Sequence, residues 1–130
     1  MLQTTAQNTY KQNQVGTATP QDLTLMLYEG GIKFIKRAKH SIQEKDFNTA
    51  HDLITRVQDI ISELIITLDR KYPVAEQMLL LYDFMKNRLI EANIKKDIAA
   101  LEEVEEFFVE FRDTWKQAMQ IARSQQPQQK

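Results

Sequence analysis

The chain has 130 residues and a mass of 15.3 kDa, a size that fits one compact domain. Its 17 Lys and Arg residues nearly balance 18 Asp and Glu residues, and a net charge of -1 gives no overall positive field to attract nucleic acid. Cysteine is absent, which excludes disulfides and thiolate sites and is typical of cytoplasmic proteins. Only three Gly and three Pro residues occur, too few for a barrel or sandwich with many tight turns, so the composition favours an all-α fold.

Residues 1–19 differ in composition from the rest of the chain. They are mostly Gln, Thr and Asn, with Leu2, Tyr10 and Val15 as their large apolar side chains. We therefore expect an N-terminal arm without a core of its own. The arm has no charged run followed by an apolar one, and no apolar stretch of the chain reaches the roughly 18 residues of a membrane span. Neither a secretory signal nor membrane insertion is expected.

Four amphipathic helices are predicted along the rest of the chain. Thr19 and Pro20 form a typical helix start, with a hydroxyl as N-cap and proline at the first helical position. Asp46 and Asp97 are suited to cap two further helices, and Pro73 ends the second helix. The predicted helices cover residues 20–44, 47–72, 74–95 and 97–123, and the Gln-rich residues 124–130 are expected to form a disordered tail.

The links between these predicted helices are only a few residues long. Short links make consecutive helices antiparallel neighbours. The sequence therefore predicts, over residues 20–123, an antiparallel up-down-up-down four-helix bundle with the N-terminal arm laid on it.

Two of the predicted helices carry more apolar side chains than a bundle needs, because a bundle helix buries an arc of little more than about 100°. On the first helix a second apolar stripe is rotated by about 130° from the core stripe, and the third helix has a similar excess. A wide stripe can also pack against two neighbouring helices at once, but a surplus of this size favours an interface. The predicted binding residues are Leu25, Tyr28, Ile32 and Ile35 on the first helix, and Leu80, Phe84, Ile90 and Ile94 on the third.

Three partners suit such a surface, and the residues themselves do not rank them. A second copy of the chain would make the free protein a homodimer. The chain's own arm could dock through Tyr10 and Val15. An amphipathic helix of another protein could lie in a groove of the bundle.

Residues typical of catalytic and metal sites do not occur in a usable pattern. His40 and His51 both lack a Glu three residues before them, which is the spacing of a carboxylate-bridged metal bundle, so no metal or other cofactor is expected. His51 lies on the polar side of its helix, and a phosphotransfer or other signalling bundle that uses His51 is the alternative function. Behind it stands a self-associating structural bundle.

Two further features of the sequence have structural interpretations. The adjacent glycines Gly30 and Gly31 lie inside the first helix, where glycine costs about 1 kcal/mol relative to alanine. They indicate either the close approach of a neighbouring segment or a tolerated helix crossing. The acidic cluster of Glu102, Glu103, Glu105, Glu106 and Glu110 is interpreted as a solvated face.

Taken together, several segments resemble the flagellar secretion chaperone family FliS, and the resemblance runs from about Tyr10 to Ala118. It includes YKQNQV in the arm, ATPQDLTLMLYEGGIKFI at the start of the first helix, IISELIITLD at the end of the second, LYDFMKNRLIEAN in the third and LEEVEEFFVEFRDTWKQA in the fourth. No segment is specific alone, but the order and spacing of all five are.

The resemblance implies a cytosolic helical bundle without catalytic activity. It further implies binding of the C-terminal segment of flagellin, which is disordered when free and helical when wrapped around the chaperone. This binding keeps flagellin from polymerising before it reaches the flagellar type III export gate. It also implies that the arm covers part of the client surface in the free protein and moves when the client binds. Tyr10 and Val15 are the arm residues that match.

Overall fold

The computed structural model describes residues 19–125, which form four long helices. These are α2 (Pro20–Gln43), α3 (Phe47–Thr67), α4 (Ala75–Lys95) and α5 (Ile98–Gln125). No strand occurs in residues 19–125, and the predicted all-α class is confirmed. Except for its last residue, Thr19, the predicted arm lies outside the described residues, as do residues 126–130 of the predicted tail.

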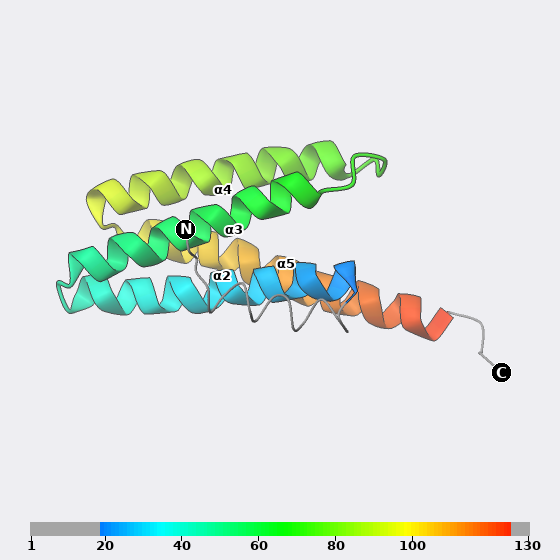
Figure 1. The fold of residues 1–130 in the computed structure, drawn as a ribbon, viewed down its shortest axis with the longest axis horizontal. Helices are drawn as coiled ribbons and strands as arrows, with labels where there is room; N and C mark the ends of the chain where they lie inside the picture. Colours follow the sequence, from blue (N-terminus) through cyan, green and yellow to red (C-terminus); the bar gives the residue numbers. More distant parts are fainter. Residues whose placement is uncertain (1–18, 126–130) are drawn as a thin grey trace.

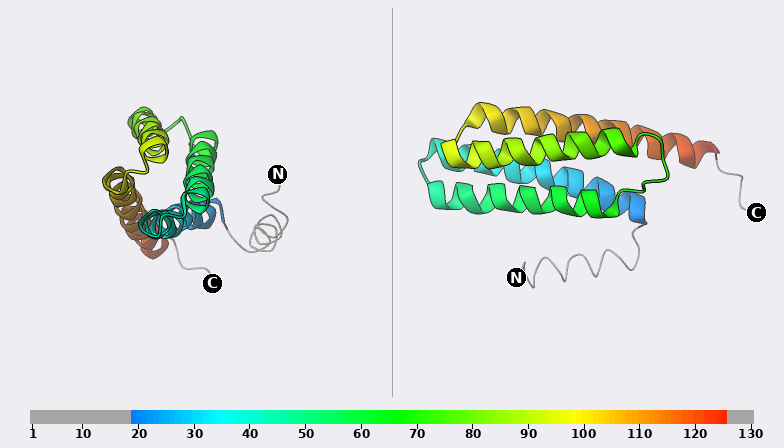
Figure 2. Two further views of the ribbon diagram at one scale, coloured as in Figure 1. Left: turned by 90° about the vertical axis from the view of Figure 1, so that its left-hand side faces the viewer. Right: turned by 90° about the horizontal axis from the view of Figure 1, so that it is seen from above.

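The four helices lie side by side along one long axis and are joined by short links at alternate ends (Figure 1). Packing contacts join α2 to α3, α3 to α4, α4 to α5, and α5 back to α2. Seen end-on in Figure 2, the helices form a ring in which α2 lies diagonally opposite α4, and α3 opposite α5. The predicted antiparallel four-helix bundle is therefore confirmed.

Capping groups within the sequence set three of the four helix starts. Thr19 and Asp22 form a capping box, in which the Thr19 hydroxyl accepts from the Asp22 N–H at 3.1 Å and the Asp22 carboxylate accepts from the Thr19 N–H at 3.2 Å. The carboxylates of Asp46 and Asp97 accept backbone N–H groups at the starts of α3 and α5, at 3.2 and 3.0 Å. By contrast, α4 begins at Ala75 without a side-chain cap, one residue later than predicted. Helix α5 continues two residues past the predicted boundary at 123.

All four helices contribute to one apolar core along the axis of the ring. Burial of each large aliphatic or aromatic side chain contributes about 1.5 to 3 kcal/mol to folding. The largest fully buried side chains are Phe108, Ile35, Ile54, Ile61, Met85, Leu89, Leu101, Val57 and Val104.

The exposed second stripe predicted on the first helix is wrong. Tyr28, Ile32 and Ile35 are 3%, 6% and 0% exposed and belong to the core. The reason is that α2 packs against both α3 and α5, so the arc that faces the core lies between the two apolar stripes. Leu27 and Phe34 of the other stripe pack against the edge of this core and are only partly buried. For α2, the surplus is therefore packed against two neighbours.

The two mid-helix glycines of α2 have different surroundings. A Cβ atom at Gly31 would lie 2.8 Å from Cζ of Phe108 and 2.9 Å from two other atoms of the same ring. At Gly30 the nearest atom would be Cδ1 of Ile60, at 3.4 Å, an ordinary packing distance. Close approach by an aromatic side chain of α5 thus explains Gly31, whereas Gly30 is a tolerated glycine at the crossing with α3.

Within the acidic cluster, Glu105 departs from the predicted solvated face because it is only 8% exposed. Its carboxylate makes ion pairs with Lys39 at 2.7 Å and Lys36 at 2.8 Å, and these join α5 to α2. Burial raises the pKa of the Glu105 carboxyl, but the hydrogen bonds and charges of the two lysines together outweigh burial and hold the pKa below its ordinary value.

This pair of contacts predicts a specific dependence of stability on pH. The pKa of Glu105 is lower in the folded than in the unfolded state. Its ion pairs therefore contribute fully to the free energy of unfolding above about pH 4.5, and this contribution is lost as the pH falls through the pKa of the folded state. Glu105→Gln should lower the free energy of unfolding at pH 7 by about 1 to 2 kcal/mol. Urea unfolding at pH 7 and at pH 3 should show this difference shrinking at pH 3. An equal difference at both pH values would contradict the ion-pair contribution.

Candidate functional site

A cavity of about 900 Å³ opens at the end of the bundle that carries the α3–α4 link. This link, residues 68–74, is longer than the links at 44–46 and 96–97. The first turns of α2 bring Pro20, Gln21 and Thr24 to this region, and Tyr28 follows one turn further along the helix. The large apolar and aromatic side chains that line it are Tyr28, Leu64, Leu68, Tyr72, Val74, Met78, Leu81, Tyr82, Phe107, Phe111 and Trp115. We call it the end cavity.

Aromatic rings connect the end cavity with the outer surface of the bundle. Phe84 on α4 contacts Phe107 on α5, with ring centroids 6.0 Å apart, and Phe107 lies 6.1 Å from Phe111. Phe111 is in turn 5.7 Å from Tyr28 on α2, which meets Trp115 edge to face at 6.4 Å. Tilted and edge-to-face arrangements at these distances are favourable. The wall of the cavity is thus continuous with exposed apolar surface at Phe84.

The surface beside the cavity is a row of exposed apolar side chains on α4. Leu80, Phe84, Ile90 and Ile94 are 72%, 43%, 41% and 78% exposed, as predicted for this helix. The row spans about 21 Å at 1.5 Å per residue. We call these four residues the α4 stripe. Large apolar side chains that share one helix face and remain exposed are typical of an interaction surface.

Two buried tyrosines cross the bundle beneath the end cavity. The hydroxyls of Tyr28 on α2 and Tyr82 on α4 are 2.8 Å apart, so one donates to the other and links two helices that are diagonal in the ring. Burial raises the pKa of both hydroxyls above the ordinary value of 10.0. At Tyr28 the hydrogen bond to Tyr82 offsets part of this rise in pKa. Because unfolded tyrosines ionise at lower pH than these two, the pair stabilises the bundle below pH 10 and its contribution declines above that pH.

Single and double substitutions should separate this hydrogen bond from packing. Tyr82→Phe leaves the Tyr28 hydroxyl buried without its partner, and we expect a loss of about 1 to 3 kcal/mol in the free energy of unfolding. Tyr28→Phe should act similarly. The double variant should be about as stable as either single variant or more stable, since no orphaned hydroxyl remains. Additive losses in denaturant titrations would show that the two hydroxyls do not interact.

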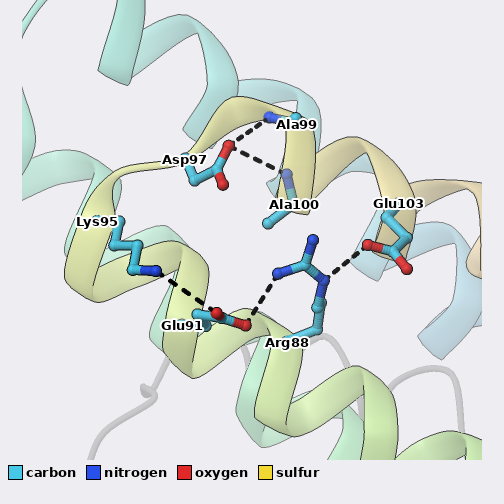
Figure 3. Close-up of polar contacts among 7 residues, drawn as sticks. All are labelled: Arg88, Glu91, Lys95, Asp97, Ala99, Ala100 and Glu103. Atoms are coloured by element: carbon cyan, nitrogen blue, oxygen red, sulfur yellow. Dashed lines mark hydrogen bonds and ion pairs between the residues drawn. The ribbon is translucent and has the colours of Figure 1, made fainter.

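Away from the end cavity, an ion pair joins α4 to α5 (Figure 3). Arg88 on α4 contacts Glu103 on α5 at 2.7 Å and Glu91 of its own helix at 2.9 Å. Lys95 lies 3.6 Å from Glu91, and Asp97 caps α5 directly after the turn. The two helices are therefore tied together in the second half of α4, whereas the first half of α4 borders the open end cavity.

The remaining predicted binding residues have mixed outcomes. Tyr10 and Val15 lie outside the described residues. Leu25 is partly buried on α2 and does not line the end cavity. Ile32 and Ile35 are core residues, so they are not part of the candidate site.

Sequence reasoning missed most of the cavity wall. Met78, Phe111 and Trp115 follow the helical period of the core, and periodicity assigns them to packing between helices. They line the cavity because the helices separate at this end, and no pattern within a single helix reports that separation. Leu81 and Phe107, at the edges of their core stripes, are equally without a sequence signal.

The alternative at His51 finds little support in the geometry. Nζ of Lys96 donates to Oδ1 of Asn93 at 2.9 Å, which leaves the Asn93 amide nitrogen to donate to Nδ1 of His51, also at 2.9 Å. His51 is thus held as part of a chain of hydrogen bonds between α3 and α4. Among residues 19–125, no three His, Asp or Glu side chains gather as metal ligands. No helix in that range has the length and apolarity to cross a membrane.

Comparison with known proteins gives one consistent family. The family model described as flagellar protein FliS matches residues 2–122. The chain is 46% identical to flagellar secretion chaperone FliS of Bacillus subtilis (strain 168) over 114 residues, which are 88% of this chain and 86% of the relative. It is 29% identical to FliS of Escherichia coli (strain K12), with 83% and 82% coverage, and 30% identical to FliS of Salmonella typhimurium, with 82% and 81%. The chain therefore belongs to the FliS family of flagellar secretion chaperones, which are not enzymes.

Proposed function

We propose that this protein is a cytoplasmic export chaperone that binds the C-terminal segment of flagellin, prevents its premature polymerisation and supports its delivery to the gate of the flagellar type III export apparatus. The observation that carries the proposal is the continuous apolar surface made by the end cavity and the α4 stripe. The names of the relatives support the export role.

The shape of this surface suits a client that bends. The α4 stripe runs along the outside of one helix, and an amphipathic client helix of about 14 residues would cover its 21 Å. The end cavity opens around the first half of the same helix, between α4, α5 and the α3–α4 link. One straight helix cannot lie along the stripe and also enter the cavity, so the client segment wraps around the start of α4.

The same surface provides a place for the N-terminal arm and for a second copy. We infer that Tyr10 and Val15 occupy part of it in the free protein and leave when the client binds. An arm with two large apolar side chains gains about 2 to 4 kcal/mol from burial before backbone entropy offsets most of it. Such an arm yields readily to a longer client. In the absence of client, two copies could associate through the same apolar residues as a homodimer.

Co-purification tests this function directly. Full-length flagellin should be retained by the immobilised chaperone, and flagellin without its C-terminal segment should not. Calorimetry with the isolated C-terminal segment should give a large negative heat-capacity change, because an apolar surface is buried and a disordered segment is ordered. Equal retention of full-length and truncated flagellin, or of neither, would contradict the proposal.

A further inference from the structure

A second concave site lies between α2 and α3, in the half of the bundle that carries the link at residues 44–46 and far along both helices from the end cavity. It is a groove of about 300 Å³. Helix α2 supplies Lys36, Arg37, His40 and Ser41, and helix α3 supplies Thr49 and Leu53. We call it the α2–α3 groove. It shares no residue with the end cavity or the α4 stripe.

The buried hydroxyl of Ser41 lines this groove without a partner. Ser41 is 8% exposed, and its hydroxyl makes no hydrogen bond with any other described residue. Buried hydroxyls are normally hydrogen-bonded, because burying a hydroxyl without a partner destabilises the folded state by about 1 to 3 kcal/mol. The groove therefore offers an unused donor beside its cationic side chains.

Lys36 and Arg37 bring positive charge to the groove, and the bundle neutralises this charge only partly. The guanidinium of Arg37, which lines the groove, and that of Arg56 on α3, which does not, lie 6.0 and 5.7 Å from the Phe34 ring. Neither arginine makes an ion pair with a residue in the range 19–125. The nearby Asp46 carboxylate is occupied as the N-cap of α3. Lys36 is shared with Glu105 on the other side of α2 but remains 65% exposed.

We propose that the α2–α3 groove binds a glutamate or aspartate side chain of an acidic peptide segment of a second protein. The carboxylate would accept hydrogen bonds from Arg37 and from the Ser41 hydroxyl, and its aliphatic stem would lie on Leu53. A carboxylate peptide is favoured over nucleic acid, because a net charge of -1 gives no overall attraction to an extended polyanion and the groove is short.

This site is independent of flagellin binding. The groove lies on α2 and α3, whereas the α4 stripe lies on the helix diagonal to α2 in the ring. Both surfaces can therefore be occupied at the same time, which would let the chaperone hold its client and an acidic partner together.

The test uses the full chain and two synthetic peptides of about 12 residues. One peptide carries four glutamates at spacings of three and four residues, and the other has glutamine at the same positions. Calorimetry at about 20 mM salt should detect binding of the glutamate peptide only, and about 200 mM salt should weaken it. Arg37→Glu should weaken binding at least about tenfold, and Arg37→Gln less strongly.

Matched controls separate a built groove from general surface charge. Arg123→Glu makes the same charge change near the end of α5 and should alter binding by less than about twofold. Ser41→Ala should leave the unfolding midpoint unchanged or raise it, since no hydrogen bond is lost and an unsatisfied hydroxyl is removed, while it should measurably weaken binding of the glutamate peptide. Equal binding of the glutamine peptide, equal effects of Arg37→Glu and Arg123→Glu, or preference for a short single-stranded DNA over the peptide would each overturn the proposal.

Discussion

Replacing Met78 with glutamate is expected to weaken flagellin binding at least about a hundredfold without unfolding the bundle. Met78 lines the end cavity on α4 and is only partly buried, so a carboxylate at this position can reach water in the free protein. When an apolar client enters, the same carboxylate must be desolvated without a cationic partner in the cavity wall. An unpaired buried charge costs several kcal/mol, and about 2.7 kcal/mol corresponds to a hundredfold change in affinity.

The matched control for this substitution is Phe47→Glu. Phe47 is an exposed apolar residue at the start of α3, at the opposite end of the bundle from the end cavity. Calorimetry with the C-terminal flagellin segment should show wild-type affinity for Phe47→Glu and a large loss for Met78→Glu, while both variants keep cooperative thermal unfolding. Comparable affinities in the two variants would show that the client does not enter the end cavity.

The second large effect is expected for Gly31→Ala. The new Cβ would lie 2.8 to 2.9 Å from three ring atoms of Phe108, whose side chain is fully buried and cannot swing away. Overpacking of this kind typically destabilises a protein by about 1 to 3 kcal/mol. The higher helix propensity of alanine over glycine offsets about 1 kcal/mol of this loss. Gly30→Ala, whose Cβ meets only Cδ1 of Ile60 at 3.4 Å, should be neutral or stabilising by up to about 1 kcal/mol. Denaturant titrations of the two variants should therefore shift in opposite directions.

A compensating substitution can identify the cause of the Gly31 effect. Phe108→Leu alone should destabilise the core, but in combination with Gly31→Ala it removes the ring that the new Cβ meets. The double variant should therefore be more stable than the sum of the two single losses predicts. If the losses of the two single variants simply added up in the double variant, contact with Phe108 would not be the cause of the destabilisation by Gly31→Ala.

Most helix starts were predictable because they depend on local capping chemistry, whereas the predicted end of the second helix at residue 72 was wrong, since α3 ends at Thr67. Thr19, Asp46 and Asp97 all cap the helices that they were expected to cap, and each does so through groups within three residues. The short links then allowed only antiparallel neighbours. The α4 stripe was also predictable, because Leu80 and Ile94 are too far from the core stripe of their helix to be buried by it.

The orientation of α2 was not predictable from its own sequence. It carries two apolar stripes, and the arc between them is buried against other helices, where the ring of Phe108 on α5 leaves no room for a Cβ at position 31. Glu105 shows the same limitation, since its burial depends on lysines of α2. The end cavity is likewise a property of several elements together, since residues of all four helices and of the α3–α4 link line it.

The distribution of ion pairs and cavity along α4 suggests how one helix serves both stability and binding. Arg88 ties the second half of α4 to Glu103 on α5, and the Tyr28–Tyr82 hydrogen bond ties α4 to α2 beneath the cavity. These contacts hold the helix in the bundle while its first half contributes to an open apolar site. Stability of the fold therefore does not require the end cavity to be filled by the described residues.

Fluorescence of Trp115 is the most direct test of the proposed client site. Trp115 is the only tryptophan of the chain, it lines the end cavity, and its indole N–H donates to the carbonyl oxygen of Gln21 at 2.9 Å. A C-terminal flagellin segment without tryptophan should, at saturation, move the emission to shorter wavelength and reduce quenching by acrylamide, because the client excludes water and quencher from the cavity. Unchanged emission and quenching, with saturation established by calorimetry, would contradict the assignment of the end cavity as the client site.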